Sequence, residues 1–97
     1  MYTPVEMDKT RNFRYGMKAI SYIEGKLKQP ISKVDFNSLT MEQTATVICA
    51  GLVHEDNTLT PDKVMDIIDE KGNFNEVVQA MGAAFTASFG NGDNSKN

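Results

Sequence analysis

The sequence predicts an all-α protein, a small single-domain bundle of about four helices. Apolar residues recur at helical spacing in four stretches, residues that cap helices flank these stretches, and no stretch gives a clear strand pattern. A length of 97 residues with 40% hydrophobic content suits one domain with one core. We expect residues 1–9 to be loosely ordered, residues 10–90 to form the helical domain, and residues 91–97 to be a disordered tail.

The first helix is expected from about residue 12 to residue 28. Its apolar residues form two stripes, so its apolar arc is unusually wide. The stripes are Phe13, Met17, Ile20 and Leu27, and Tyr15, Ala19, Tyr22 and Ile23. Lys26 and Lys28 suit the negative end of the helix dipole, and Pro30 stops the helix. Residues 29–39 then form a loop.

The second helix, about residues 41–54, is expected to begin at a capping box made by Thr40 and Gln43. One face of it is apolar and carries Ala45, Ile48, Cys49, Leu52 and Val53. Cys49 is the only cysteine, which excludes an internal disulfide and fits a reducing compartment. Its place on the apolar face indicates a small core residue.

The third helix, about residues 61–70, follows an acidic loop. Thr60 can cap it, Pro61 suits its first position, and Gly72 ends it. The fourth helix, about residues 74–89, follows a possible capping box of Asn73 and Glu76. Gly90 then serves as its C-cap.

The net charge of −3 conceals a strong asymmetry along the chain. Residues 9–33 contain seven lysines and arginines and one acidic residue, whereas residues 34–80 contain nine acidic residues and two lysines. Such a chain can be steered onto a charged partner or can stack head to tail with copies of itself. Alternatively, the two halves attract each other within one fold.

The sequence gives no sign of a reaction centre or a metal site. One histidine and one cysteine fall short of a zinc ligand set. An EF-hand is excluded because Pro61 and Ile67 stand where glycine and glutamate are needed. His54 is interpreted as a C-terminal helix residue favoured by the dipole. We therefore expect no enzyme and no cofactor, and the short apolar runs predict no membrane span.

Two other functions remain open at this stage. Ser38 precedes a leucine near a helix start, as does the prosthetic-group serine of acyl and peptidyl carriers, but Asn37 replaces the usual aspartate before it. The second alternative is a small helical nucleic-acid-binding regulator that uses a basic stripe of Arg11, Arg14 and Lys18. The acidity of the whole chain and the shortness of the stripe argue against nucleic acid.

Several segments together resemble a known family. They are Asp8 to Gly16, Ala19-Ile20 with Ile23-Glu24, Ala50 to Leu52 with His54 to Asp56, and Leu59-Thr60 with Val64 and Ile67 to Asp69. In order and spacing they resemble the small, all-helical tail assembly chaperones of tailed bacteriophages and prophages, over roughly residues 8–86. The resemblance implies a non-enzymatic role in virion morphogenesis. Such proteins bind the tape-measure protein and the major tail-tube protein in the host bacterial cytoplasm and are absent from the mature virion.

We expect Arg14, Tyr15, Lys18 and Tyr22 to contact the partner, because aromatic residues beside cationic ones are common interface anchors. Many such chaperones are also made in a longer form by ribosomal frameshifting. If the final codons were TCA-AAA-AAC, for Ser95, Lys96 and Asn97, they would contain the slippery heptamer A-AAA-AAC.

Overall fold

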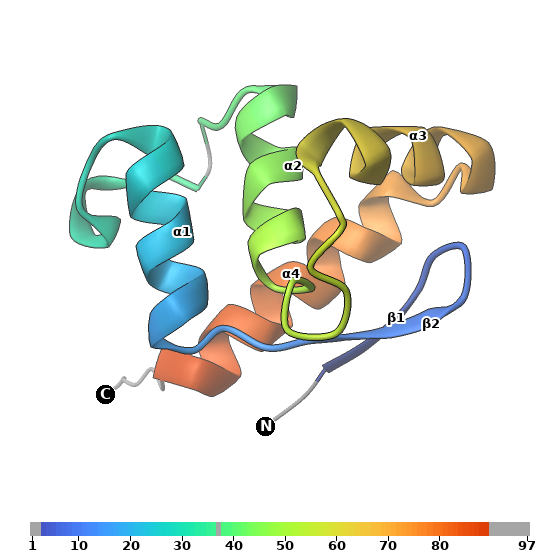
Figure 1. Cartoon of the computed structure of the whole chain (residues 1–97), viewed down its shortest axis with the longest axis horizontal. Coiled ribbons are helices and arrows are strands. Elements are labelled where there is room, and N and C mark those ends of the chain that lie inside the picture. Colours follow the sequence, from blue (N-terminus) through green and yellow to red (C-terminus); the bar gives the residue numbers. More distant parts are fainter. Residues whose placement is uncertain (1–2, 37, 90–97) are drawn as a thin grey trace.

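The computed structural model describes residues 3–36 and 38–89, and it has a mixed α/β fold (Figure 1). Its elements are β1 (Thr3–Glu6), β2 (Thr10–Phe13), α1 (Met17–Leu27), η1, a short 3-10 turn (Ile31–Lys33), α2 (Met41–Ala50), α3 (Pro61–Lys71) and α4 (Phe74–Phe89). The predicted helices are present, but the two strands form an antiparallel sheet. The all-α prediction is therefore wrong. The predicted disordered tail lies outside the described residues.

The N-terminal hairpin replaces both the loosely ordered segment and the first turns of the predicted helix. Val5 pairs with Arg11 and Thr3 with Phe13 in the antiparallel register. Side chains at alternate positions are buried, namely Val5, Met7, Arg11, Phe13 and Tyr15. This period of two is that of a strand, so α1 begins only at Met17.

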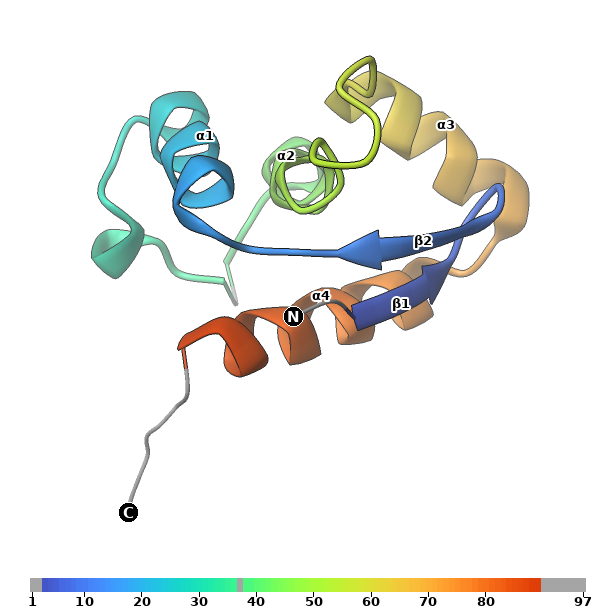
Figure 2. The same cartoon turned by 60° about the horizontal axis from the view of Figure 1, so that its bottom comes forward.

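The hairpin lies between two layers of helices. In Figure 2, α4 lies on one side of it, and α1, α2 and α3 lie on the other. Helix α2 is the central element of its layer, packing on α1 and on α3, and its residues from Thr44 to Ala50 are all buried. Ala45, Ile48 and Cys49 are buried as predicted, but burial extends all round this part of α2 and is not limited to the one predicted face, and the helix ends at Ala50, before Leu52 and Val53.

The helix caps read from the sequence are largely confirmed. Thr40 and Gln43 make both hydrogen bonds of a capping box. The hydroxyl of Thr60 accepts a hydrogen bond from the amide of Lys63, with Pro61 at the first helical position, and Gly72 ends α3 at a φ of 70°. These signals are local, which is why sequence alone locates them.

The predicted capping box at the start of α4 is not formed. The side-chain amide of Asn73 donates to the carbonyl oxygen of Glu6 at 2.6 Å, so it ties β1 to the start of α4. Its buried Oδ1 has no hydrogen-bond partner among the described residues. Within the described ranges no helix combines the length and the apolar content needed to cross a membrane.

Candidate functional site

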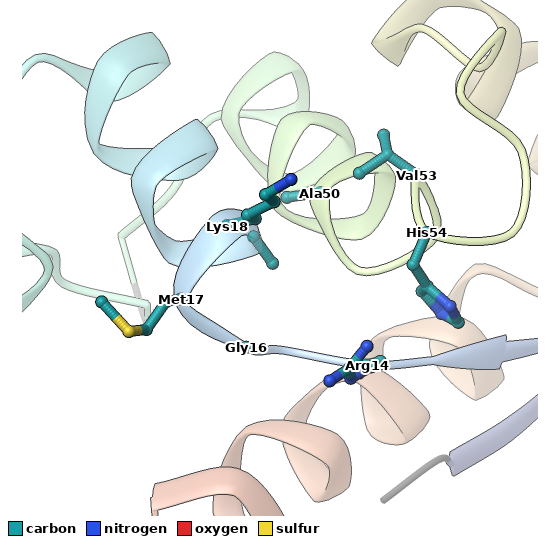
Figure 3. Close-up of a pocket in the computed structure, with 8 residues that line it drawn as sticks. Arg14, Gly16, Met17, Lys18, Ala50, Val53 and His54 are labelled. Atoms are coloured by element: carbon teal, nitrogen blue, oxygen red, sulfur yellow. The ribbon is translucent and has the colours of Figure 1, made fainter.

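A groove opens where β2 leads into α1, opposite the end of α2. Its volume is about 730 Å³, and we call it the α1–α2 groove (Figure 3). It is lined by Arg14, Gly16, Met17, Lys18, Ala19, Ala50, Val53 and His54. Ala19 and Ala50 are buried, while Arg14 and Lys18 are exposed. The groove thus combines an apolar floor with positive charge at its rim.

Met17 stands at the edge of this groove with 91% of its surface exposed. Figure 3 shows its side chain turned away from the residues that line the opposite wall. An exposed methionine adapts easily to different partners because its side chain is flexible and polarizable. Together with the neighbouring cations, it offers a contact for an apolar residue next to an acidic one.

The floor of the groove is fixed by very close packing at Gly51. The amide of Arg14 donates to the carbonyl of Gly51 at 2.9 Å. Beneath this contact, the hydroxyl of Tyr15 donates to the carbonyl of Val47 at 2.8 Å, and the Tyr15 ring stacks on Phe85 with centroids 4.2 Å apart. These hydrogen bonds and this ring contact hold the segment that follows β2 against α2 and α4.

The loop after α2 forms one wall of the α1–α2 groove and is hydrogen-bonded to the outer edge of β2. Nε2 of His54 lies 2.7 Å from the carbonyl oxygen of Asn12, so this nitrogen carries the proton and donates. The two carboxylate oxygens of Glu55 accept from the side-chain and backbone N–H groups of Asn12, each at 3.1 Å. These hydrogen bonds, the side-chain one foremost, lower the pKa of Glu55.

A buried arginine reinforces the same junction. Arg11 is 4% exposed, and its Nε and Nη2 donate to the two carboxylate oxygens of Asp8, both at 2.8 Å. Its Nη1 lies 3.7 Å from Oδ2 of Asp56 in the loop after α2. The hydrogen bond from Arg11 lowers the pKa of Asp8. Arg11 therefore stabilises the fold. Because it is buried, only Arg14 and Lys18 of the three residues of the predicted basic stripe could contact a nucleic acid.

The structure separates the four predicted partner-binding residues. Arg14 and Lys18 are exposed and line the α1–α2 groove, and their role in binding a partner stays a prediction. Tyr15 is only 3% exposed, so its prediction as a surface contact is wrong. The reason is the strand period, which turns Tyr15 inward with Phe13.

Tyr22 lies further along α1 and is half-buried. Its hydroxyl is 3.8 Å from Sγ of Cys49, and its pKa is raised to about 12, chiefly by burial. The amine of Lys26 lies 5.7 Å from the centre of its ring. Tyr22 thus belongs to the seam between α1 and α2, outside the lining of the α1–α2 groove.

Other residues considered from sequence have structural roles. Ser38 is exposed in the loop before α2, and its hydroxyl donates to Asp35 at 3.1 Å. Thr40, two residues later, is the N-cap of α2, so Ser38 does not stand at the helix start. Asn37 lies outside the described residues. In the part of the chain that the structure describes, no three metal-ligating side chains gather.

Sequence reasoning missed Met17, Val53 and His54 as lining residues. The sequence places Met17 in an apolar stripe because it predicts that the first helix starts at about residue 12, whereas α1 starts at Met17. Val53 and His54 were placed at the end of the second helix, whereas that helix ends at Ala50. A glycine at position 51 was the available signal that the chain turns there.

Comparisons with protein-family models, with curated proteins and with solved structures find no match for this chain. The functional interpretation therefore depends on the groove and on the segments that form it.

Proposed function

We propose that this protein is a tail assembly chaperone. It is a non-enzymatic protein that binds the tape-measure protein and the major tail-tube protein while a phage tail is built. It acts in the host bacterial cytoplasm and is absent from the mature virion. The physical task is to cover surfaces of tail proteins that would otherwise associate too early.

One observation carries this proposal. Three of the segments that resemble the family, Asp8 to Gly16, Ala19-Ile20, and Ala50 to Leu52 with His54 to Asp56, supply five of the eight residues that line the α1–α2 groove, although the last lies far from the others in the sequence. Two hydrogen bonds hold these segments side by side. One runs from the amide of Arg14 to the carbonyl of Gly51, and the other joins the His54 ring to the carbonyl of Asn12. Residues that carry the resemblance therefore supply one continuous surface.

The chemistry of that surface suits a segment of another protein. The alanine floor accepts an apolar side chain, the exposed Met17 extends the apolar surface at the edge of the groove, and each buried methylene group contributes about 0.8 kcal/mol. Arg14 and Lys18 attract carboxylates beside that apolar residue, which raises the association rate and favours acidic segments. A chaperone needs such moderate contacts because its partner must be released when the tail forms.

Co-expression tests the function. The chain is produced together with a tail-tube protein and a tape-measure protein from the same phage or prophage, and complexes are isolated by affinity capture and size-exclusion chromatography. We expect a stable complex of the unmodified chain with at least one of the two. If it binds neither, the proposed function is wrong.

A pair of methionine variants tests the location. Met17→Asp places a charge at the groove, whereas Met41→Asp is a matched control, because Met41 is also exposed, at 62%, but lies on α2 outside the groove. We expect Met17→Asp, and Arg14→Glu likewise, to weaken capture about tenfold or more, a loss of about 1.4 kcal/mol. Equal capture by the two methionine variants would place the contact elsewhere, provided that circular dichroism shows both folded.

The gene offers an independent check. A tail-tube gene upstream and a very long tape-measure gene downstream would agree with the proposal, and a slippery heptamer near the final codons would add to it. A neighbourhood without tail genes would count against it.

A further inference from the structure

Charged residues of opposite sign lie on two helices, α1 and α3, that flank α2 on either side. Helix α1 carries Lys18, Tyr22 and Lys26 at intervals of four residues, which places them along one line of its surface. Helix α3 carries Asp62, Asp66 and Glu70 at the same intervals. We call these the α1 basic row and the α3 acidic row. All four of their end residues are exposed.

The two rows match in length and are opposite in sign, with two lysines on α1 and three carboxylates on α3. Four residues of an α-helix rise about 6 Å, so each row is about 12 Å long. In an antiparallel arrangement Lys26 meets Asp62 and Lys18 meets Glu70. This arrangement also opposes the two helix dipoles, because the negative end of α1 lies beside the positive end of α3.

Within one molecule, α2 lies between the two helices that carry the rows (Figure 1). The C-terminal end of α1 and the first residue of α3, Pro61, come near each other only across the start of α2. Among the described residues, the ion pairs are those of Arg11 with Asp8 and Asp56, and none joins α1 to α3. The charge asymmetry of the sequence is therefore not neutralised by contact between these helices within the fold.

The α1 basic row also borders two hollows of the surface. The α1–α2 groove lies at its Lys18 end, and a second depression of about 540 Å³ lies at its Lys26 end, where Glu42 of α2 and Pro61 of α3 are also among the lining residues. The acidic carboxylate nearest along α1, that of Glu24, accepts a hydrogen bond from the backbone of Ile31 and so is engaged by the following loop.

From this complementarity we infer that a second copy of this chain docks its α3 acidic row on the α1 basic row. The contact uses different surfaces on the two copies, so each copy keeps one free row after pairing. Such a head-to-tail contact repeats, and it produces a ring if the rotation closes or a filament if it does not. This inference does not require a tail protein, because the purified chain alone contains both surfaces.

Sedimentation velocity of the purified chain over a range of concentrations tests the inference. At low ionic strength we expect species larger than the monomer, and we expect them to dissociate at about 0.5 M salt, because exposed charges are then screened within a few ångströms. A zero-length carbodiimide cross-linker should join Lys18 to Glu70 in a covalent dimer, as detected by mass spectrometry. A chain that stays monomeric at every concentration in low salt overturns the inference.

Charge-reversal variants give the decisive comparison. Lys18→Glu with Lys26→Glu, and separately Asp62→Lys with Glu70→Lys, should each give a monomer, whereas an equimolar mixture of the two variants should associate again. The matched control is Lys9→Glu with Lys33→Glu, which changes two exposed lysines outside both rows and has the same net charge as the first variant. We expect this control to associate like the unmodified chain. A control that also becomes monomeric, or a mixture that fails to associate, refutes the proposed contact.

Discussion

Replacing Gly51 by alanine should severely destabilise the protein. A Cβ at this position would lie 2.5 Å from Cζ of Tyr15 and 2.7 Å from Cδ1 of Phe13. The backbone of Gly51 has φ −76° and ψ −10°, which alanine adopts without strain, so the penalty is purely steric. Tyr15 cannot move aside easily, because it is stacked on Phe85 and hydrogen-bonded to the carbonyl of Val47.

The size of the effect follows from the overlap. Carbon atoms are normally about 3.5–4.0 Å apart in contact, so the new methyl group intrudes by roughly 1 Å on two rings. Inserting a methyl group into a packed core costs about 1–3 kcal/mol, and rings held on both sides place Gly51→Ala at the upper end. For a domain of this length, about 3 kcal/mol lowers the melting temperature by roughly 10–20 °C.

Thermal unfolding followed by circular dichroism measures this change, and Gly25→Ala is the matched control. Gly25 lies within α1, is exposed, and would meet nothing within 4 Å of an added Cβ. Alanine there should raise the free energy of unfolding by about 1 kcal/mol through helix propensity. If Gly51→Ala melts within a few degrees of the unmodified chain, the packing of β2 against the end of α2 is not as described.

Three further changes have defined outcomes. Lys28 holds a left-handed conformation, with φ 59° and ψ 40°, at the end of α1, so Lys28→Gly should stabilise the protein by about 1 kcal/mol. Lys26→Gly, inside the helix, should destabilise it by a similar amount. Urea unfolding compares the two variants, and the opposite order of stability would exclude backbone strain at Lys28. Tyr15→Phe should cost only about 1 kcal/mol in the same assay, because the carbonyl of Val47 keeps a backbone partner, and a loss of several kcal/mol would contradict this. The folded state lowers the pKa of Glu55, so the stability that this carboxylate contributes is present above its ordinary pKa of 4.5 and is lost as the pH falls through the folded value. Glu55→Gln should therefore flatten the decline in stability that is measured between neutral pH and about pH 3. An unchanged slope would mean that the hydrogen bonds of Glu55 to β2 are not formed.

The helices could be predicted from sequence because their signals are local. The capping box at Thr40 and the Thr60-Pro61 start of α3 each lie within a few residues of the bonds they make. The hairpin could not, because a charged residue interrupts its apolar alternation. Arg11 occupies an inward position and is tolerated there only because Asp8 and the more distant Asp56 neutralise it.

The candidate site was predictable only in part for a related reason. Arg14 and Lys18 are charged and lie at the surface whether this segment is a strand or a helix. Their surface position could therefore be predicted even though the predicted start of the first helix is wrong. Tyr15 faces a different direction in a strand than in a helix, and its assignment failed. The groove also depends on Val53 and His54, whose proximity to β2 is a tertiary contact that no spacing along the chain reveals.

A two-stranded sheet has two unpaired edges, to which another chain could add as a further strand. In this hairpin several of the backbone groups at these edges are missing or already hydrogen-bonded. On β1, Pro4 has no N–H group to offer and Asn73 takes the carbonyl of Glu6. On β2, His54 and Glu55 take the groups that an incoming chain would need. A protein proposed to keep others from premature polymerisation therefore does not offer them these edge groups, and contacts that it makes through side chains can be reversed by salt and competing ligands.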